Sequence, residues 1–217
     1  MDHAELEGIA RAALDETCTS SPVDAEALAC ALDVEVRDYP GPEPFVDLER
    51  RCIYMPTRPV RATRWHGAVA HELGHVLLRE HRLDWQDEIA AAYLAGALLV
   101  PRETLDRDLR NGWSVRELRA RHPNASHEML VRRVTQLRPA VATVIDAGRV
   151  TTRVASPWLE PARVAPVRVW EMSMVGRALV EGEVIEDGPS VATHAGTDRV
   201  VAVTRRWFVE PASSDPA

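Results

Sequence analysis

The chain has 217 residues, enough for one sizeable domain with a small additional unit. Hydrophobic residues (46%) and charged residues (27%) occur in the proportions of an ordinary soluble globular protein, and the net charge of −7 argues against a main function in coating nucleic-acid phosphates, although not against a local basic patch. Three dispersed cysteines without a CxxC pair exclude a disulfide framework and a zinc knuckle. Without a signal peptide or an apolar run longer than about a dozen residues, the protein is expected in the cytoplasm.

The first half of the chain is predicted to be mainly helical. Apolar residues recur at helical spacing in four segments, at about 4–18, 21–32, 64–79 and 87–99. Ser21 and Pro22 predict the start of the second helix, as its N-cap and first residue. Between the second and third helices, alternating residues and turn residues predict short strands, of which Arg51 to Met55 is the best candidate.

The second half is predicted to change from helices to strands. Residues 114–137 predict two short helices around a turn, with Ser114 and Ser126 as N-caps. The elements expected from Pro139 onward are a hairpin that turns at Ala147 and Gly148, strands at 165–170 and 198–210, and a helix at about 171–184. The whole chain is therefore expected to be α+β, with a mainly helical core and a small antiparallel sheet (residues 1–110), a helix-turn-helix-like subdomain (111–138) and a small α/β C-terminal region (139–217).

The segment AHELGH contains the pattern H-E-x-x-H. On a helix, His71 and His75 lie one turn apart on the same face and can bind one zinc ion, while Glu72 lies beside that face and could act as general base. A pentapeptide also arises by chance, and the segment would then be a surface helix with two histidines. The apolar flanks favour the metal site, because buried imidazoles and a buried carboxylate are costly unless they are paired or coordinated. Gly74 indicates that something packs against this helix, since glycine costs about 1 kcal/mol relative to alanine there.

A catalytic zinc site needs a third protein ligand. The candidates downstream of the motif are Glu80, His81, Asp84, Asp87 and Glu88. Glu80 and His81 lie near the end of the same helix, whereas Glu88 opens the next helix, whose small residues would let the two helices approach closely. Glu88 is the preferred ligand. Asp87 is the alternative, because the sequence fixes the rotational phase of this helix only to within about one residue.

The two segments AHELGHVLLREH and DEIAAAYLAGALLVP together resemble the ImmA/IrrE family of bacterial zinc peptidases. In that family an AHELGH helix precedes a segment of the type E-x-x-A-x-x-(F/L)-A-x-x-L-L-x-P. The resemblance covers about residues 23–101 and extends more loosely to residue 137. The sequence departs from the family at Ala92, where Asn is frequent, and at Leu94, where Phe is frequent, which concerns the support of the site and not its ligands.

The resemblance implies a zincin-like peptidase core in which His71, His75 and Glu88 bind Zn²⁺ and Glu72 is the general base. It also implies an endopeptidase that cleaves a partner transcriptional repressor of the helix-turn-helix type, in a stress or mobile-element response. The alternative is a non-catalytic transcriptional regulator or protein-binding module on a peptidase scaffold. The intact Glu72 favours the enzyme, because a scaffold has no chemical need for a carboxylate there.

The sequence leaves two further roles near the motif undecided, the donor to the oxyanion and the binding of an extended substrate. The oxyanion of the reaction needs a further hydrogen-bond donor, and Tyr93 and His81 are candidates, although each is more simply explained as structural. The strand at Arg51 to Met55 could pair with an extended substrate, or it could be a fully paired internal strand.

The predicted helix pair is rich in arginine and has two interpretations. Its second helix could lie in the major groove of DNA, or the pair could pack on the peptidase and dock the repressor. Glu117 and Glu128 reduce the net positive charge of the helix pair and favour the second interpretation. The arginines concerned are Arg116, Arg119, Arg121, Arg132, Arg133 and Arg138.

The C-terminal region is a candidate sensory region, because some members of the family carry a GAF-like region there. Its tryptophans, Trp158, Trp170 and Trp207, are expected in the core and not on a ligand platform. The isolated histidines His122, His127 and His194 are expected to have no metal role.

Overall fold

A computed structural model of the chain describes residues 2–57, 62–110, 115–157, 169–182, 184–187, 190–194 and 199–204. Within these residues the chain forms eight helices and two sheets, so the predicted α+β class is confirmed. The chain divides into two compact units, the first made of residues 1–113 and 117–133, the second of residues 114–116 and 134–217. None of the helices among these residues has the length and apolar character needed to cross a membrane.

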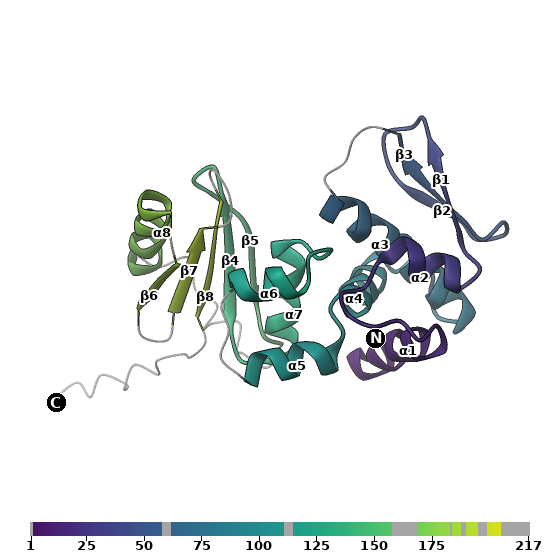
Figure 1. Ribbon diagram of the computed structural model, residues 1–217, viewed down its shortest axis with the longest axis horizontal. Helices are drawn as coiled ribbons and strands as arrows, with labels where there is room; N and C mark the ends of the chain where they lie inside the picture. Colours follow the sequence, from purple (N-terminus) through teal and green to yellow (C-terminus); the bar gives the residue numbers. More distant parts are fainter. Residues whose placement is uncertain are drawn as a thin grey trace, which may run out of the picture. The chain divides into compact units, whose positions relative to one another are not determined.

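The first unit contains a small sheet and most of the helices (Figure 1). Its helices are α1 (His3–Glu16), α2 (Ala25–Ala31), α3 (Ala62–Glu80), α4 (Glu88–Leu99) and α5 (Arg102–Arg110). Helices α6 (Val115–Arg121) and α7 (His127–Leu137) each have one end in the second unit. The strands are β1 (Glu35–Tyr39), β2 (Phe45–Asp47) and β3 (Cys52–Pro56).

Helices α3 and α4 pack side by side at the centre of this unit (Figure 1). Helix α4 is apolar on all sides and nearly all of it is buried, as expected of a helix that other helices cover. Gly74 of α3 makes this close packing feasible: a Cβ atom at this position would lie 2.9 Å from the carbonyl oxygen of Ala91 in α4. The expectation that something packs against Gly74 is therefore confirmed.

The predicted N-cap of the second helix, Ser21, is wrong. Helix α2 begins at Ala25, and the carboxylate of Asp24 accepts hydrogen bonds from the N–H groups of Glu26 (2.9 Å) and Ala27 (3.0 Å). A carboxylate in this position both satisfies the first free N–H groups and interacts favourably with the helix dipole. Ser21 instead lies near His122, outside the helix.

The small sheet has the order β1-β3-β2, with β3 in the centre. Strand β2 pairs antiparallel to β3, as expected of the small sheet, whereas β1 pairs parallel to it. Because both edges of β3 are occupied, this strand is internal and cannot pair with a substrate. Its buried side chains, Cys52, Ile53 and Met55, explain why it reads as the best strand in the sequence.

The second unit contains a five-stranded antiparallel sheet of order β5-β4-β8-β7-β6. Its elements are β4 (Val141–Asp146), β5 (Arg149–Ala155), α8 (Val169–Glu181), β6 (Val184–Asp187), β7 (Ser190–His194) and β8 (Arg199–Thr204). Helix α8 covers the strands β6 to β8 on one face (Figure 1). The core between helix and sheet consists of Ile145, Met174, Val175, Ala178, Ala192 and Val200.

The hairpin predicted at Ala147 and Gly148 is confirmed, since both residues have positive φ angles (48° and 73°) as a two-residue hairpin turn requires. The strand predicted at 165–170 is wrong at its end, because residues 169 and 170 are the first turn of α8, and residues 165–168 lie outside the described residues. Burial of Met174, Val175 and Ala178 against the sheet stabilises a helix here. The strand predicted at 198–210 is described at Arg199–Thr204.

Candidate metal centre

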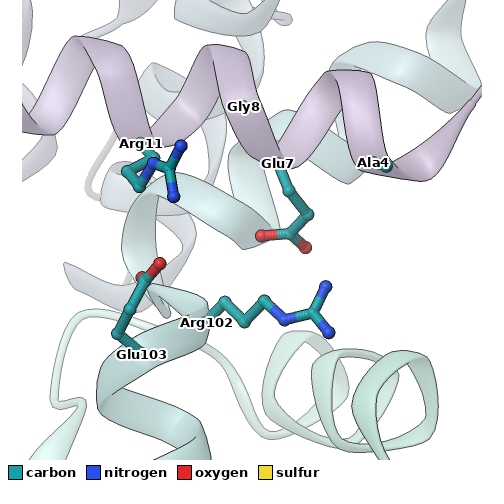
Figure 2. Close-up of a pocket in the computed structure, with 6 residues that line it drawn as sticks. All are labelled: Ala4, Glu7, Gly8, Arg11, Arg102 and Glu103. Carbon is teal, nitrogen blue, oxygen red and sulfur yellow. The ribbon is translucent and has the colours of Figure 1, made fainter.

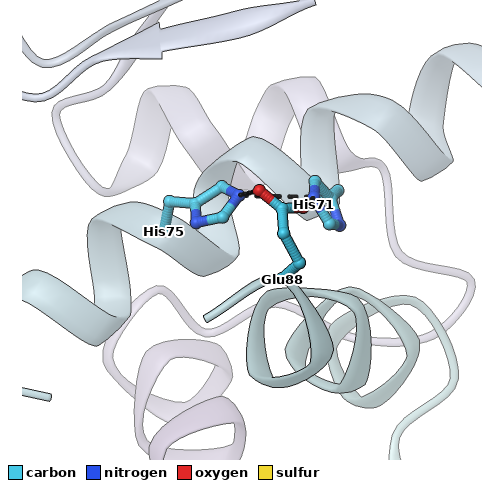
Figure 3. A group of neighbouring side chains, drawn as sticks. All are labelled: His71, His75 and Glu88. Carbon is cyan, nitrogen blue, oxygen red and sulfur yellow. Dashed lines mark hydrogen bonds and ion pairs between the residues drawn. The ribbon is translucent and has the colours of Figure 1, made fainter. Parts of the chain in front are cut away.

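Two neighbouring helices bring three side chains with metal-binding atoms together. His71 and His75 lie one turn apart on α3, and Glu88 is the first residue of α4. Figure 3 shows the carboxylate of Glu88 between the two imidazoles. Each residue offers one ligand atom, and these atoms all lie within 4.8 Å of one another.

The distances between these atoms suit a tetrahedral metal ion. Nε2 of His71 is 3.0 Å from Glu88 Oε2 and 3.3 Å from Nε2 of His75, and Nε2 of His75 is 3.7 Å from Glu88 Oε1. A tetrahedron with ligand bonds of about 2.0–2.2 Å has edges of about 3.3–3.6 Å. Two imidazoles and one carboxylate leave a fourth position open, as in catalytic zinc sites.

The backbone of the loop before α4 orients one of the imidazoles. Nδ1 of His75 lies 2.5 Å from the carbonyl oxygen of Trp85. A carbonyl oxygen only accepts, so Nδ1 donates to it, and Nε2 faces the carboxylate of Glu88, where its lone pair can bind a metal ion. Such an arrangement of a lone pair and a carboxylate is favourable when a cation lies between them, so the residues fit a divalent metal.

Glu72 lies beside this group and is buried, with an exposed fraction of 7%. Burial raises the pKa of its carboxyl group, and the nearby His71 and His75 oppose the rise. The backbone of Val46 in β2 makes a hydrogen bond to the same carboxylate, which links the edge strand of the sheet to the site. A buried carboxylate of raised pKa next to a candidate metal site is a typical arrangement for a proton acceptor.

The other candidates for the third ligand have different partners. The carboxylate of Asp87 caps α4 by accepting from the N–H groups of Ile89 and Ala90, both at 3.0 Å. Glu80 pairs with Arg51, and Asp84 accepts a hydrogen bond from the N–H of Gln86. His81, exposed at the end of α3, is not in the group of metal-binding atoms.

Tyr93 and the arginines of the helix pair are also largely engaged elsewhere. The hydroxyl of Tyr93 donates to Glu7 (2.7 Å), away from the metal-binding atoms, so a structural role fits it best. Arg133 is 1% exposed and pairs with Glu7, so its guanidinium is not accessible to a DNA phosphate. Arg121 pairs with Asp108 and Arg132 pairs with Glu128. This favours the packing interpretation of the helix pair over DNA reading.

Of the remaining sequence candidates, His122 and His127 do not belong to the metal-binding group. His122 is buried and hydrogen bonds with Asp108 (3.2 Å), and His127 begins α7. Trp158 and Trp207 lie outside the described residues, and for Trp170 and His194 the structure describes only the backbone. Sequence reasoning missed Trp85 and Val46, because both contribute backbone groups, which every residue carries and no sequence pattern marks.

Two histidines one helical turn apart, with a carboxylate from the following helix, define a class of sites suited to a single catalytic metal ion. The family model of the IrrE N-terminal-like domain, Peptidase M78, matches residues 33–135, which include all three of these residues. This match supports the membership of the ImmA/IrrE family that the sequence resemblance predicts.

A solved structure shares the fold over most of the chain. It is a Mycobacterium tuberculosis transcriptional regulator, with a TM-score of 0.66 and 13% sequence identity, and the match covers 92% of this chain and 75% of that chain. At this identity the similarity concerns the fold alone. No curated protein matches the chain.

Proposed function

We propose that the protein is a zinc-dependent endopeptidase in which His71, His75 and Glu88 hold the metal and Glu72 is the general base. The observation that carries this proposal is the convergence of three ligand atoms from α3 and α4 within a peptidase-family domain. Imidazole nitrogens and a carboxylate are ligands that zinc accepts, and three of them with an open fourth position are the donor set of catalytic zinc.

The chain's own residues supply the proton transfers. Bound zinc supplies Lewis-acid activation of water and of the scissile carbonyl. Glu72 takes the proton of the attacking water and passes it to the leaving amine, and its raised pKa makes it a better proton acceptor than an exposed carboxylate. The carbonyl of Trp85 holds His75 in the tautomer that presents Nε2 to the metal.

The proposed substrate is a helix-turn-helix transcriptional repressor in the cytoplasm, whose cleavage starts a stress or mobile-element response. Membership of a peptidase family supports a protein substrate, and the family resemblance of the two motif segments supports the repressor. The isolated enzyme is expected to be slow until an activating signal arrives, because unregulated proteolysis would be harmful. Residues 139–217 are proposed as a sensory region, beside a peptidase domain (1–110) and a helix-turn-helix-like subdomain (111–138).

A second candidate function is a non-catalytic transcriptional regulator on the same scaffold. The observation that favours it is the shared fold with a protein that is titled a transcriptional regulator. This candidate needs the protein surface of the site but not the proton transfers of Glu72.

The variant Glu72→Gln distinguishes the two functions. Purified wild-type protein should contain about one zinc per chain and cleave a small helix-turn-helix repressor encoded beside its gene. Glu72→Gln should keep the zinc and lose cleavage, because glutamine cannot accept the proton. Glu80→Gln, an exposed residue of the same helix outside the metal-binding group, is the matched control and should retain both.

The decisive measurement is relief of repression in cells. If Glu72→Gln relieves repression as well as the wild type does, the non-catalytic regulator is the correct function. If the purified protein binds no zinc at micromolar metal concentrations, the metal centre itself is refuted.

A further inference from the structure

A pocket of about 290 Å³ lies between helix α1 and the start of α5, within the first unit (Figure 2). Its lining residues are Ala4, Glu7, Gly8, Arg11, Arg102 and Glu103. None of them belongs to the metal centre. Its volume is close to the lower end of the range for small-molecule pockets, about 300 Å³.

One of the four charges in this pocket is already compensated by the protein. Glu7 accepts hydrogen bonds from Nη1 and Nη2 of the buried Arg133, at 2.6 and 3.2 Å, and from the hydroxyl of Tyr93 at 2.7 Å. A carboxylate held in this way by a buried guanidinium contributes little net charge to the pocket.

The other three charges have no such partner. Arg11, Arg102 and Glu103 make no hydrogen bond or ion pair with any residue that the structure describes. Of these three residues, Arg102 acts on Glu7 through its charge, in addition to the charge of Arg133. Figure 2 shows Arg11 and Glu103 on opposite walls, with their charged groups directed toward one another across the pocket. The pocket therefore presents two guanidinium groups and one carboxylate that are available to a ligand.

Gly8 leaves space at the wall of the pocket. A Cβ atom built on Gly8 would meet no atom within 4 Å, although this glycine lies in the middle of α1. Alanine would favour the helix by about 1 kcal/mol at such a position. An open wall at this point lets a ligand approach the helix backbone.

We propose that this pocket binds an acidic α-amino acid, with its two carboxylates on Arg11 and Arg102 and its ammonium group on Glu103. Two guanidinium groups and one carboxylate are complementary to two negative charges and one positive charge in a molecule of this size. Arginine is suited to the role because its guanidinium binds carboxylates through paired hydrogen bonds. The site is independent of zinc and of peptidase activity.

Calorimetric titration of the full chain with L-glutamate, glutarate and inorganic phosphate tests the proposal. Glutarate carries the same two carboxylates but no ammonium group, so it should bind about tenfold more weakly than L-glutamate. Glu103→Gln should remove most of that difference, and Arg102→Gln should weaken both ligands about tenfold. Arg110→Gln, an exposed arginine of α5 outside the pocket, should bind as the wild type does.

Gly8→Leu provides a steric test, because its side chain enters open space and should abolish binding without lowering the melting temperature. Binding of L-glutamate that survives Gly8→Leu in the folded protein would overturn the proposal, since the site would lie elsewhere. Phosphate binding as tight as L-glutamate would show a simple anion site and would also overturn it. Failure of L-glutamate to saturate up to about 50 mM would show that these charges are only solvated.

Discussion

Asp87 and Glu88 are neighbouring acidic residues with different structural roles. The carboxylate of Asp87 satisfies the free N–H groups at the start of α4, and that of Glu88 faces the two histidines of α3. The sequence leaves both open as ligands, since each is acidic and they differ by one position. The first turn of the helix separates them, because the N-cap side chain folds back on the backbone while the next side chain points outward.

Substitution of Glu88 should weaken metal binding, whereas substitution of Asp87 should lower the stability of the protein. Glu88→Gln should weaken zinc binding by about 100-fold or more, because even residues that only support a metal ligand contribute about 10–100-fold. Asp87→Ala should keep one zinc per chain and lower the free energy of unfolding by about 1 kcal/mol through loss of the cap. Zinc titration with a competing chelator and urea unfolding measure the two quantities. Loss of zinc in Asp87→Ala with Glu88→Gln unaffected would reverse the assignment.

His122 is a buried histidine whose protonation is linked to stability. Its side chain is fully buried, with Nε2 at 3.2 Å from Asp108 and Nδ1 at 3.4 Å from Ser21. Burial lowers the pKa of His122, and the hydrogen bond and charge of Asp108 only partly oppose this effect. The folded protein therefore takes up this proton less readily than the unfolded chain does.

The sign of the pH dependence follows from that lowered pKa. The contribution of His122 to stability is fully present above the ordinary histidine pKa of about 6.5 and is lost as the pH falls below it. Urea unfolding at about pH 7.5 and about pH 5.5 should show a smaller loss on acidification in His122→Gln than in the wild type. His127→Gln, at the start of α7, serves as the control and should behave as the wild type does. An equal loss in His122→Gln would contradict the prediction.

The approach of α3 and α4 determines whether Glu88 can reach the histidines. At Gly74 the two backbones are so close that a Cβ atom would lie 2.9 Å from the oxygen and 3.1 Å from the Cα of Ala91. Backbone atoms cannot move aside as a flexible side chain can. Any side chain at this position must therefore separate the helices near the metal centre.

Gly74→Ala should thus lower stability by about 1–3 kcal/mol and weaken zinc binding by about 10–100-fold, even though alanine favours a helix. Gly67→Ala in the same helix is the matched control. Its Cβ would meet only the side chain of Met129 at 3.8 Å, so stability should stay equal or rise by up to about 1 kcal/mol. Equal zinc affinity in both variants would show that the helix spacing does not control the site.

A buried ion pair in the first unit joins two helices that are far apart in the chain. Glu7 in α1 and Arg133 in α7 are separated by 126 positions, and their side chains are 12% and 1% exposed. Burial raises the pKa of Glu7, but the hydrogen bonds and charge of Arg133 outweigh it, so the pKa lies below its usual value. Arg133 also donates to the carbonyl of Val100 and lies over the ring of Tyr93, which joins α4 to the same network.

Removing one partner of this pair should be far more costly than removing both. Glu7→Gln leaves a buried guanidinium without its counter-charge and should lower the free energy of unfolding by about 3–5 kcal/mol. The double variant Glu7→Leu with Arg133→Met should recover much of that loss, because apolar side chains need no counter-charge. Arg132→Gln, which breaks an exposed pair with Glu128, should cost less than about 1 kcal/mol. Urea unfolding of the four proteins checks this order.

Features that depend on residues close in the chain could be predicted from the sequence. The spacing of His71 and His75 places both imidazoles on one helical face wherever the helix packs. Ala147 and Gly148 turn the hairpin because a two-residue turn needs two residues that accept positive φ angles. The short-range geometry of the backbone is sufficient in both cases.

Features that depend on partners distant in the chain could be recognised only in the folded structure. The choice of Glu88 over Asp87, the central place of β3, the carbonyl of Trp85 on His75 and the burial of Arg133 all involve segments that meet only on packing. An arginine in a helix has the same local pattern whether it faces water, DNA or a buried glutamate. Its partner is determined by which surfaces pack together, and that depends on the burial energy of the whole unit.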